Sequence, residues 1–364
     1  MTTPEQVIRE DIRALSPYHV PPSAGMIKLD AMENPYRLPP NLQAEIAAVV
    51  QAAELNRYPD PLAPALKARL RAAMEIPEGF DLLLGNGSDE IIQMIIQACA
   101  RPGACIMAPS PTFAMYRQYC LVAGLAYVGV PLAPDFSLDL GRFLAAMQEH
   151  RPAVVFISYP NNPTGNLFAA QDLASIISKA PGVVVVDEAY QPFADATFMG
   201  RLRDFPNLVL LRTVSKLGLA GLRLGYAVAH PGWIREFDKV RSPYNVNVLT
   251  QVVAEKVLAH PEVFAQQAAA IRAERARLVA ALDALPGVQA FPSQANFVLA
   301  RVPDATRVFE ELRQRRILVK SLHGMHALLD QCVRFTIGTP EENAKLVSAL
   351  QAIERGAAAA NRVG

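Results

Sequence analysis

The stretch "GVVVVDEAY", residues 182–190, decides the fold class of this chain. Four consecutive valines, 183–186, are followed at once by two carboxylates. A short, continuous apolar run of this kind is typical of a strand that is covered on both faces. Further runs of the same character are "DLLLG" (81–85), "CIMAP" (105–109), "LAYVGV" (125–130), "AVVFIS" (153–158), "NLVLLRT" (207–213) and "GYAVA" (225–229).

Segments with helical period lie between many of these runs, such as "SDEIIQMIIQACA" (88–100) and "AQDLASIISKA" (170–180). Strands that alternate with helices form a mostly parallel sheet between two helical layers. We therefore predict an α/β fold, with a mostly parallel seven-stranded sheet between helices in its large domain.

Length and composition indicate more than one domain. The chain has 364 residues, of which 51% are hydrophobic, and this suits one large and one smaller domain. Residues 1–40 are rich in proline and are expected to form an arm that packs with the smaller domain or a partner subunit. Residues 41–245 are expected to form the large domain. Residues 246–364 combine a long helical pattern with short strands and predict a smaller α+β domain.

Several classes of function are not expected. The net charge is +1 without a basic block, so nucleic acid is not an expected partner. The cysteines have no CxxC spacing, and neither an HExxH motif nor a carboxylate-rich partner accompanies His323 and His326, which favours reduced thiols and no metal site. The charged N-terminal sequence does not resemble a signal peptide, and no apolar run reaches the ~18 residues that span a membrane. We expect a cytoplasmic protein.

Ligands of parallel sheets bind beyond the carboxyl ends of the strands. At one such end, "LGNGSDE" (84–90) leads from a strand through glycines into a helix, where backbone N–H groups can bind phosphate. A helix N-cap by Ser88 or Asp89 would explain the same residues. At another strand end, "YPNNPTG" (159–165) has the composition of a turn whatever the protein does. The same turn could also aim the amide of Asn161 or Asn162 at the crevice beyond the strand ends.

Asp187 and Glu188 follow the four valines directly. A carboxylate at the mouth of a buried strand is costly unless it is paired. It could bind magnesium, but no GxxxxGK[ST] motif accompanies it. It could instead hold a protonated ring nitrogen.

The stretch "TVSKLGLAGLRLGY" (213–226) places Lys216 behind Ser215 and before a glycine-rich run, with Arg223 seven residues further on. An ordinary surface lysine is the alternative. A helix N-terminus, a hydroxyl and a guanidinium can together neutralise a phosphate, and a lysine can form a Schiff base with an aldehyde. Together with a carboxylate such as Asp187, which can pair with a pyridinium nitrogen, this set of groups matches pyridoxal phosphate, whose ring acts as an electron sink.

The motifs "SYPNNPTG", "VVVVDEAY" and "TVSKLGLAGLRLG", in this order, resemble those of the fold-type-I pyridoxal-phosphate-dependent aminotransferases. Outer motifs, among them "KLDAMENPY" (28–36), "LNRYPDP" (55–61) and "CVRFTIGTPEENAKLVSAL" (332–350), are similar to those of the histidinol-phosphate aminotransferase subfamily. The resemblance covers essentially the whole chain, and it implies pyridoxal 5′-phosphate as cofactor and a homodimer as the active unit.

The resemblance implies a role for each matching residue. Lys216 would bond to the cofactor and then move a proton between the substrate's α-carbon and the cofactor, while Asp187 would keep the ring nitrogen protonated. The other cofactor contacts would be Asn162 and Tyr190 at the 3′-oxygen, Gly87, Ser88, Ser215 and Arg223 at the phosphate, Asp89 at the helix start beside it, Phe113 on the ring face, and Tyr58 at the phosphate of the other subunit's cofactor.

For the substrate, the resemblance implies that Arg334 binds the glutamate carboxylate and the phosphate of the second substrate in turn. Tyr18 and Asn34 would line the same pocket. Lys320 stands where relatives often have a second arginine, and lysine keeps the charge but lacks the bidentate fork.

The implied reaction is a ping-pong transfer of the amino group between L-glutamate/2-oxoglutarate and imidazole-acetol phosphate/L-histidinol phosphate, in histidine biosynthesis. An aromatic or broad-specificity aminotransferase is the nearest alternative. A threonine-phosphate decarboxylase and a non-catalytic sensor that binds pyridoxal phosphate are further alternatives. A sensor in a transcription regulator needs a DNA-binding module, and the proline-broken first 40 residues show no helix-turn-helix pattern.

Overall fold

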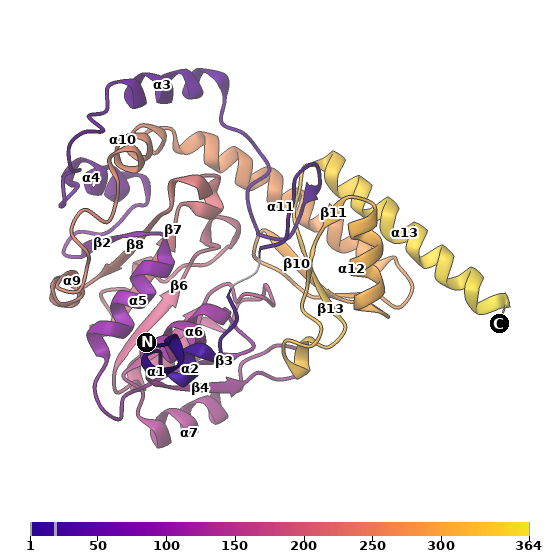
Figure 1. Cartoon of the computed structure of the whole chain (residues 1–364), viewed down its shortest axis with the longest axis horizontal. Coiled ribbons are helices and arrows are strands. Elements are labelled where there is room, and N and C mark those ends of the chain that lie inside the picture. Colours follow the sequence, from indigo (N-terminus) through magenta and orange to yellow (C-terminus); the bar gives the residue numbers. More distant parts are fainter. Residues whose placement is uncertain (1, 18–19, 364) are drawn as a thin grey trace.

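The computed structural model of the chain describes residues 2–17 and 20–363. Its larger unit is built on a seven-stranded sheet with the order β2-β8-β7-β6-β5-β3-β4 (Figure 1). The strands are β2 (Asp81–Asn86), β3 (Cys105–Ser110), β4 (Ala126–Pro131), β5 (Val154–Ser158), β6 (Val183–Asp187), β7 (Leu208–Thr213) and β8 (Leu224–Ala229). β8 runs antiparallel to both of its neighbours, and the other neighbouring pairs are parallel. The predicted strands and the mostly parallel sheet are confirmed.

The four valines of β6 explain why the sheet has helices on both faces. Successive strand residues point to opposite faces. Val183 and Val185 belong to one buried cluster, together with residues of α5, α6 and α9. Val184 and Val186 belong to another, together with residues of α7 and α8. These helices are α5 (Ser88–Cys99), α6 (Ala114–Val122), α7 (Leu140–His150), α8 (Ala170–Lys179) and α9 (Pro231–Asp238).

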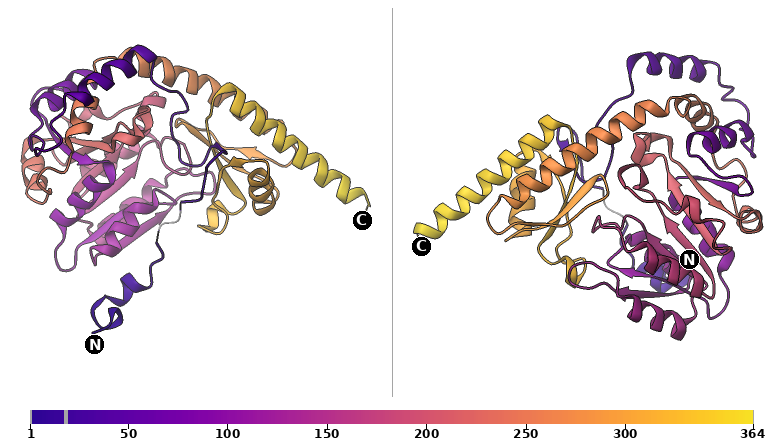
Figure 2. Two further views of the ribbon diagram at one scale, coloured as in Figure 1. Left: turned by 45° about the horizontal axis from the view of Figure 1, so that its top comes forward. Right: turned by 180° about the vertical axis from the view of Figure 1, so that it is seen from behind.

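A smaller unit follows in the chain and lies beside the first (Figures 1 and 2). Its antiparallel sheet has the order β12-β13-β10-β9. The elements are α11 (Pro261–Asp283), β9 (Gln289–Ala290), β10 (Phe297–Arg301), α12 (Ala305–Gln314), β11 (Ile317–Leu318), β12 (Lys320–Ser321), β13 (Cys332–Thr336) and α13 (Pro340–Val363). A separate core forms here, with Ile271, Phe297, Leu312, Phe335 and Leu346 among its members.

Three further helices lie at one end of the larger unit. α10 (Val248–Val257) packs against α3 (Pro40–Gln51) and α4 (Pro64–Ala73), and its buried residues Val253, Ala254 and Val257 join a core cluster of the larger unit. The division at residue 245 stays a prediction.

The N-terminal arm has little regular structure. It contains the short helices α1 (Pro4–Val7) and α2 (Glu10–Arg13) and the strand β1 (Ile27–Lys28), which pairs in parallel with β11 of the smaller unit. Arg9 donates to the carbonyls of Leu121 and Val122 at the end of α6. Short 3-10 turns complete the described elements: η1 (Gln191–Phe193), η2 (Met199–Arg201), η3 (Ser215–Leu217), η4 (Ala220–Leu222) and η5 (Ala327–Leu329).

Two features are absent from the described residues. None of the helices in 2–17 and 20–363 combines the length and the apolar character that crossing a membrane requires. Within the same ranges, no three His, Cys, Asp or Glu side chains are grouped so that they could hold a metal ion.

Candidate active site

Lys216 lies in η3, directly after β7, and its side chain reaches the N-terminal arm. Its Nζ donates to the carbonyl oxygen of Ala31 at 3.2 Å and lies 5.8 Å from the centroid of the Tyr190 ring. Burial, and next to it the charge of Arg334, lower the pKa of Lys216 from 10.5 to about 8. A lysine with this pKa has an appreciable fraction of neutral amine near neutral pH, as a nucleophile or general base requires.

Asp187 is the last residue of β6 and is 4% exposed. Its Oδ2 accepts a hydrogen bond from the Tyr116 hydroxyl at 2.7 Å, and its Oδ1 accepts one from the N–H of Ala189 at 3.1 Å. Burial raises the pKa of Asp187 to about 6, against the hydrogen bond from Tyr116, which lowers it. The carboxylate therefore lies fixed at the carboxyl end of the central strand, where a cationic partner would stabilise its ionised form.

A chain of hydrogen bonds connects the two units across the site. The Nδ2 of Asn162 donates to the Tyr190 hydroxyl at 3.0 Å, and the Nη1 of Arg334 donates to the Oδ1 of Asn162 at 2.6 Å. The Nη2 of Arg334 donates to the carbonyl of Asp30 at 2.9 Å. Asn162, Tyr190 and Arg334, which the sequence predicts as site residues, are thus brought together by hydrogen bonds between the two units.

Asn161 and Glu188, which the sequence left as candidates beside Asn162 and Asp187, have structural partners. Asn161 bonds to Thr164 and to the carbonyl of Pro111, and so shapes its own turn. Glu188 is 1% exposed and pairs with Arg212 at 2.7 Å. Arg212 neutralises this carboxylate, which favours a structural role for Glu188.

The loop after β2 forms a cradle at the start of α5. Gly87 has a φ of +83°, and a Cβ there would lie 2.6 Å from the Nη2 of Arg223. A Cβ on Gly225 would lie 2.3 Å from the backbone nitrogen of Ser88. The glycines thus let the guanidinium and a second strand approach the first N–H groups of the helix, and such groups bind anions.

Two further predicted residues flank this cradle. The hydroxyl of Ser215 is fixed by Thr213 at 2.9 Å. Asp89, in the first turn of α5, lies 3.6 Å from Arg223, and its buried Oδ1 has no hydrogen-bond partner among the described residues. Backbone amides, a hydroxyl and a guanidinium together form a donor set that fits a phosphate group.

The N-terminal arm is bonded to the smaller unit and also reaches Lys216. Thr336 and Asn296 of the smaller unit bond to the backbone N–H and carbonyl of Met32 at 3.0 Å and 2.9 Å. Two residues further on, the Nδ2 of Asn34 donates to the carbonyl of Leu217 at 2.9 Å. Asn34 therefore lies beside Lys216.

Lys320 and Phe113 are two further predicted site residues whose positions the structure gives. Lys320 faces Arg334 directly across β12 and β13, and burial lowers the pKa of Lys320. Phe113 begins α6 and packs edge-on against Tyr116, with ring centroids 5.4 Å apart. Tyr18 lies outside the described residues.

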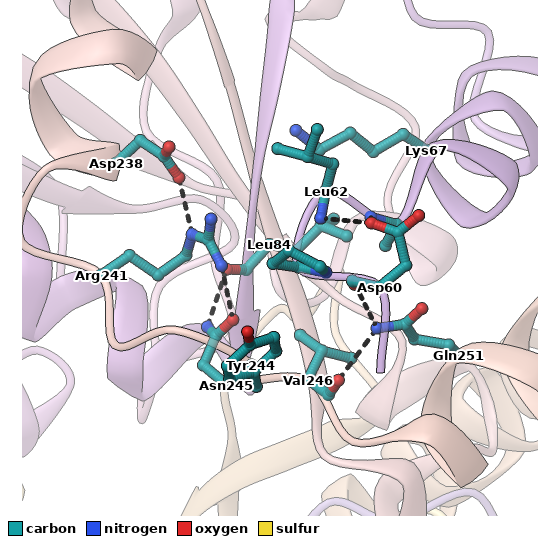
Figure 3. A pocket seen from close by; sticks show the side chains of 12 residues that line it. Asp60, Leu62, Lys67, Leu84, Asp238, Arg241, Tyr244, Asn245, Val246 and Gln251 are labelled. Carbon is teal, nitrogen blue, oxygen red and sulfur yellow. Dashed lines mark hydrogen bonds and ion pairs between the residues drawn. The ribbon is translucent and has the colours of Figure 1, made fainter. Parts of the chain in front are cut away.

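Tyr58 is 81% exposed and stacks on Tyr244 with ring centroids 4.5 Å apart. Among the described residues it does not contact Lys216 or Asp187 of its own chain, but its loop is firmly anchored. Beside Tyr244, the side chain of Gln251 donates to the carbonyls of Asp60 and Val246 at 3.0 Å each (Figure 3). The stacked pair is therefore presented to solvent from a fixed loop.

Sequence reasoning missed Tyr116, Ala31 and Met32. Tyr116 lies six residues beyond the end of β3, whereas the residues singled out from the sequence follow their strands immediately. Ala31 acts through its backbone carbonyl, and the Met32 sulfur accepts from the Tyr190 hydroxyl at 3.3 Å. The arm motif "KLDAMENPY" was the available signal for both.

Comparison with known proteins agrees with this geometry. The family model described as aminotransferase class I and II matches residues 24–350. The chain is similar to "Histidinol-phosphate aminotransferase 2" of Cupriavidus pinatubonensis, with 56% identity over 96% of each chain. It is also similar to "Histidinol-phosphate aminotransferase 1" of Ralstonia nicotianae, with 55% identity over 95% of this chain and 94% of the relative.

Among solved structures, the histidinol-phosphate aminotransferase of Sinorhizobium meliloti in complex with pyridoxal-5′-phosphate superposes with a TM-score of 0.86, at 24% identity, over 96% of this chain and 98% of that one. That likeness supports the fold. Together, these matches confirm the predicted fold class and the predicted pyridoxal-phosphate-dependent aminotransferase activity. The chain belongs to the class I and II aminotransferase family, and within it to the histidinol-phosphate aminotransferases.

Proposed function

We propose that this protein transfers the amino group between L-glutamate and imidazole-acetol phosphate at the site that contains Lys216, in histidine biosynthesis. The observation that carries the proposal is the amine of Lys216, which donates to the Ala31 carbonyl and lies against the Tyr190 ring, and whose pKa burial lowers to about 8. The full-length similarity to histidinol-phosphate aminotransferases supports the choice of substrate.

The residues present fit pyridoxal 5′-phosphate, which supplies an aldehyde and a ring that accepts electrons from the reacting carbon. Asp187 would hold the ring nitrogen in its protonated form, because a buried carboxylate stabilises a cationic neighbour. Asn162 and Tyr190 would hydrogen-bond the 3′-oxygen, and Phe113 would cover a ring face. The phosphate would be held by Gly87, Ser88, Ser215 and Arg223, with Asp89 beside it and Tyr58 of the partner subunit reaching it from the other side.

Lys216 would act as the general base and acid. Its Nζ would accept the proton released from the α-carbon of the bound amino acid, hold it and donate it again in the second half of the transfer. Arg334 supports this role in two ways: its charge lowers the pKa of Lys216, and its guanidinium is suited to a carboxylate or phosphate. Glutamate and the phosphorylated substrate would use Arg334 in turn, with Lys320 opposite it and Tyr18 and Asn34 at the same pocket.

A homodimer is part of the proposal. Tyr58, Leu55 and Leu62 are exposed large side chains on one loop, at 81%, 69% and 62%. An anchored loop with several exposed apolar side chains is typical of a protein interface. We propose that this loop enters the neighbouring subunit's site.

Complementation tests the dimer. Lys216→Ala and Tyr58→Ala homodimers should both be strongly impaired. Mixed dimers should regain activity, because one of their two sites has an intact Lys216 and an intact Tyr58. Analytical ultracentrifugation gives the stoichiometry, and a fully active monomer would contradict this part.

A cytoplasmic location, expected from the charged N-terminal sequence, also belongs to the proposal. Cell fractionation with an antibody against the protein tests it.

The substrate is tested by steady-state kinetics. With 2-oxoglutarate as acceptor, kcat/KM should be higher for L-histidinol phosphate than for L-phenylalanine, and the Lys216→Ala variant should have no activity with either. A preference for phenylalanine would favour the aromatic aminotransferase alternative and leave the fold and cofactor unaffected. Release of carbon dioxide from threonine phosphate would favour the decarboxylase alternative.

A further inference from the structure

Tyr116 is a buried residue to which the predicted mechanism gives no role. It lies in the first turns of α6 and is 0% exposed. Its hydroxyl donates to the Oδ2 of Asp187 at 2.7 Å. A hydrogen bond of this kind, between a neutral donor and a carboxylate inside a protein, is stronger than one between neutral groups.

The ring of Tyr116 is held on two sides. It stacks on Phe156 of β5, with centroids 4.7 Å apart and an interplanar angle of 12°. Phe113 lies at its edge, 5.4 Å away at 85°. Since Phe113 is the residue expected on the cofactor ring, Tyr116 connects the two predicted ring contacts, Phe113 and Asp187. With the ring held between these contacts, the hydroxyl lies at the carboxylate of Asp187.

The other oxygen of Asp187 is bonded to the backbone N–H of Ala189. Burial is the largest influence that raises the pKa of Asp187, and the hydrogen bond from Tyr116 is the largest that lowers it. A group that donates to the ionised form of an acid favours that form. The hydroxyl therefore counteracts part of the effect of burial.

Other ionisable groups around the pair act in the opposite direction. Asp89 of α5 and Glu188, next to Asp187 in the chain, each raise the pKa of Asp187. Tyr127 of β4 raises the pKa of Tyr116. Glu188 is itself paired with Arg212. Among these neighbours, Tyr116 is thus the side chain that favours an ionised Asp187.

We propose that Tyr116 is the positioning residue of Asp187: its hydroxyl orients the carboxylate and favours its anionic form, so that the carboxylate can hold the ring nitrogen of pyridoxal phosphate as a cation. This inference rests on the proposed function. Tyr116 itself does not touch substrate, and it acts only through Asp187.

The test is Tyr116→Phe, which keeps the ring and removes the hydroxyl. Apoprotein from this variant should bind pyridoxal 5′-phosphate about ten-fold more weakly than wild type, the size of one hydrogen bond to a charged group. As the pH is lowered, the variant should also lose affinity at a pH about one unit higher than wild type does. The reason is that the pKa of Asp187 rises when its hydrogen-bond donor is removed. Binding is measured by fluorescence titration across pH.

A second readout follows the ring nitrogen directly. With ¹⁵N-labelled pyridoxal phosphate, the nitrogen resonance of the Tyr116→Phe protein should move toward the unprotonated position, because a more basic carboxylate takes a larger share of the proton. A purely structural role would not change this resonance. Replacement of Tyr116 by 3-fluorotyrosine, a stronger donor of the same shape, should shift the acid side of the binding profile in the opposite direction.

Tyr226→Phe is the matched control. Tyr226 is a buried tyrosine, 1% exposed, whose hydroxyl pairs with Arg212 and not with Asp187. It should lose a comparable amount of thermal stability while its pH profile and nitrogen resonance stay as in wild type. In an Asp187→Asn background, Tyr116→Phe should have no further effect on cofactor affinity, because the two residues act as one unit.

An unchanged affinity, pH profile and nitrogen resonance in Tyr116→Phe would overturn the inference while the proposed function stands. So would an equal effect of the substitution with and without Asp187. If wild-type apoprotein did not bind pyridoxal phosphate at all, the proposed function would fail, and this inference with it.

Discussion

Lys320 and Arg334 lie directly opposite each other on the antiparallel strands β12 and β13. Opposite residues of an antiparallel pair have Cβ atoms about 5 Å apart on one face of the sheet. Two cations so close repel each other, and the charge of Arg334 lowers the pKa of Lys320 further than burial alone does. A dianionic phosphate between them would remove that repulsion, whereas a single carboxylate would do so only in part.

We therefore expect Lys320→Met to raise the KM for histidinol phosphate by roughly ten-fold, the effect of losing one partly buried ion pair with the phosphate. The KM for glutamate should change much less. Lys320→Arg should keep or lower the KM for histidinol phosphate, since it adds a bidentate fork. Steady-state kinetics with both substrates is the measurement, and an equal change of the two KM values would speak against a phosphate role for Lys320.

The stability of the apoprotein should depend on Lys216. Its pKa is about 8 in the folded chain and 10.5 as an ordinary lysine, so the folded state binds fewer protons between these values. Stability should therefore rise as the pH increases from about 8 to about 10.5, and the full destabilisation should be present below about pH 8. Lys216→Met should stabilise the apoprotein at about pH 7 by at most about 3 kcal/mol and flatten this rise.

Urea unfolding of apoprotein at about pH 7 and about pH 10 measures the difference. Lys239→Met is the control, since the Lys239 side chain is 63% exposed and should show no comparable gain. A Lys216→Met protein that is less stable than wild type at both pH values would contradict the lowered pKa.

Gly87→Ala should weaken cofactor binding by more than its cost in stability. The φ of +83° strains any side chain there, and the new Cβ would lie 2.6 Å from the Nη2 of Arg223. We expect a loss of about 1 kcal/mol in stability and at least ten-fold weaker binding of pyridoxal phosphate, because the guanidinium must leave the cradle.

Gly79→Ala separates the two effects. Gly79 has a similar φ of +88°, but nothing lies within 4 Å of its added Cβ. It should lose similar stability and keep the cofactor affinity of wild type. Equal cofactor affinities for the two variants would show that the cradle does not depend on the position of Arg223.

Arg212→Met should be strongly destabilising. Glu188 is 1% exposed and would remain buried without its cation, a change that typically costs 3–5 kcal/mol in similar cases, so we expect about 4 kcal/mol here. Removing both charges, with Arg212→Met and Glu188→Gln, should recover part of the loss. Chemical unfolding measures all three proteins, and the exposed pair Lys239–Glu236 is the control, with an expected cost below about 0.5 kcal/mol.

The fold could be predicted because each buried strand has its own apolar run in the sequence. The valines of β6 alternate between two helical layers, and this alone requires a sheet covered on both faces. Lys216, Asp187 and Asn162 could be singled out because ligands of parallel sheets bind where the strands end. The antiparallel direction of β8 could not be foreseen, since an apolar run has the same pattern in either direction.

Other parts of the site depend on tertiary contacts that leave no local pattern. The amides of Asn161 and Asn162 are neighbours in one turn, and only their partners distinguish a turn-forming side chain from a site residue. Tyr116 reaches Asp187 from a helix, 71 positions away in the chain. Ala31 contributes a carbonyl, which any residue would have carried.

The N-terminal arm has a mechanical consequence. Residues 27–32 are bonded to the smaller unit through β11, Thr336 and Asn296, yet the carbonyl of Ala31 in the same segment holds the amine of Lys216. Any rotation of the smaller unit therefore displaces the acceptor of that amine. A ligand that drew the two units together would therefore also move the Ala31 carbonyl, the resting partner of the amine that transfers the proton.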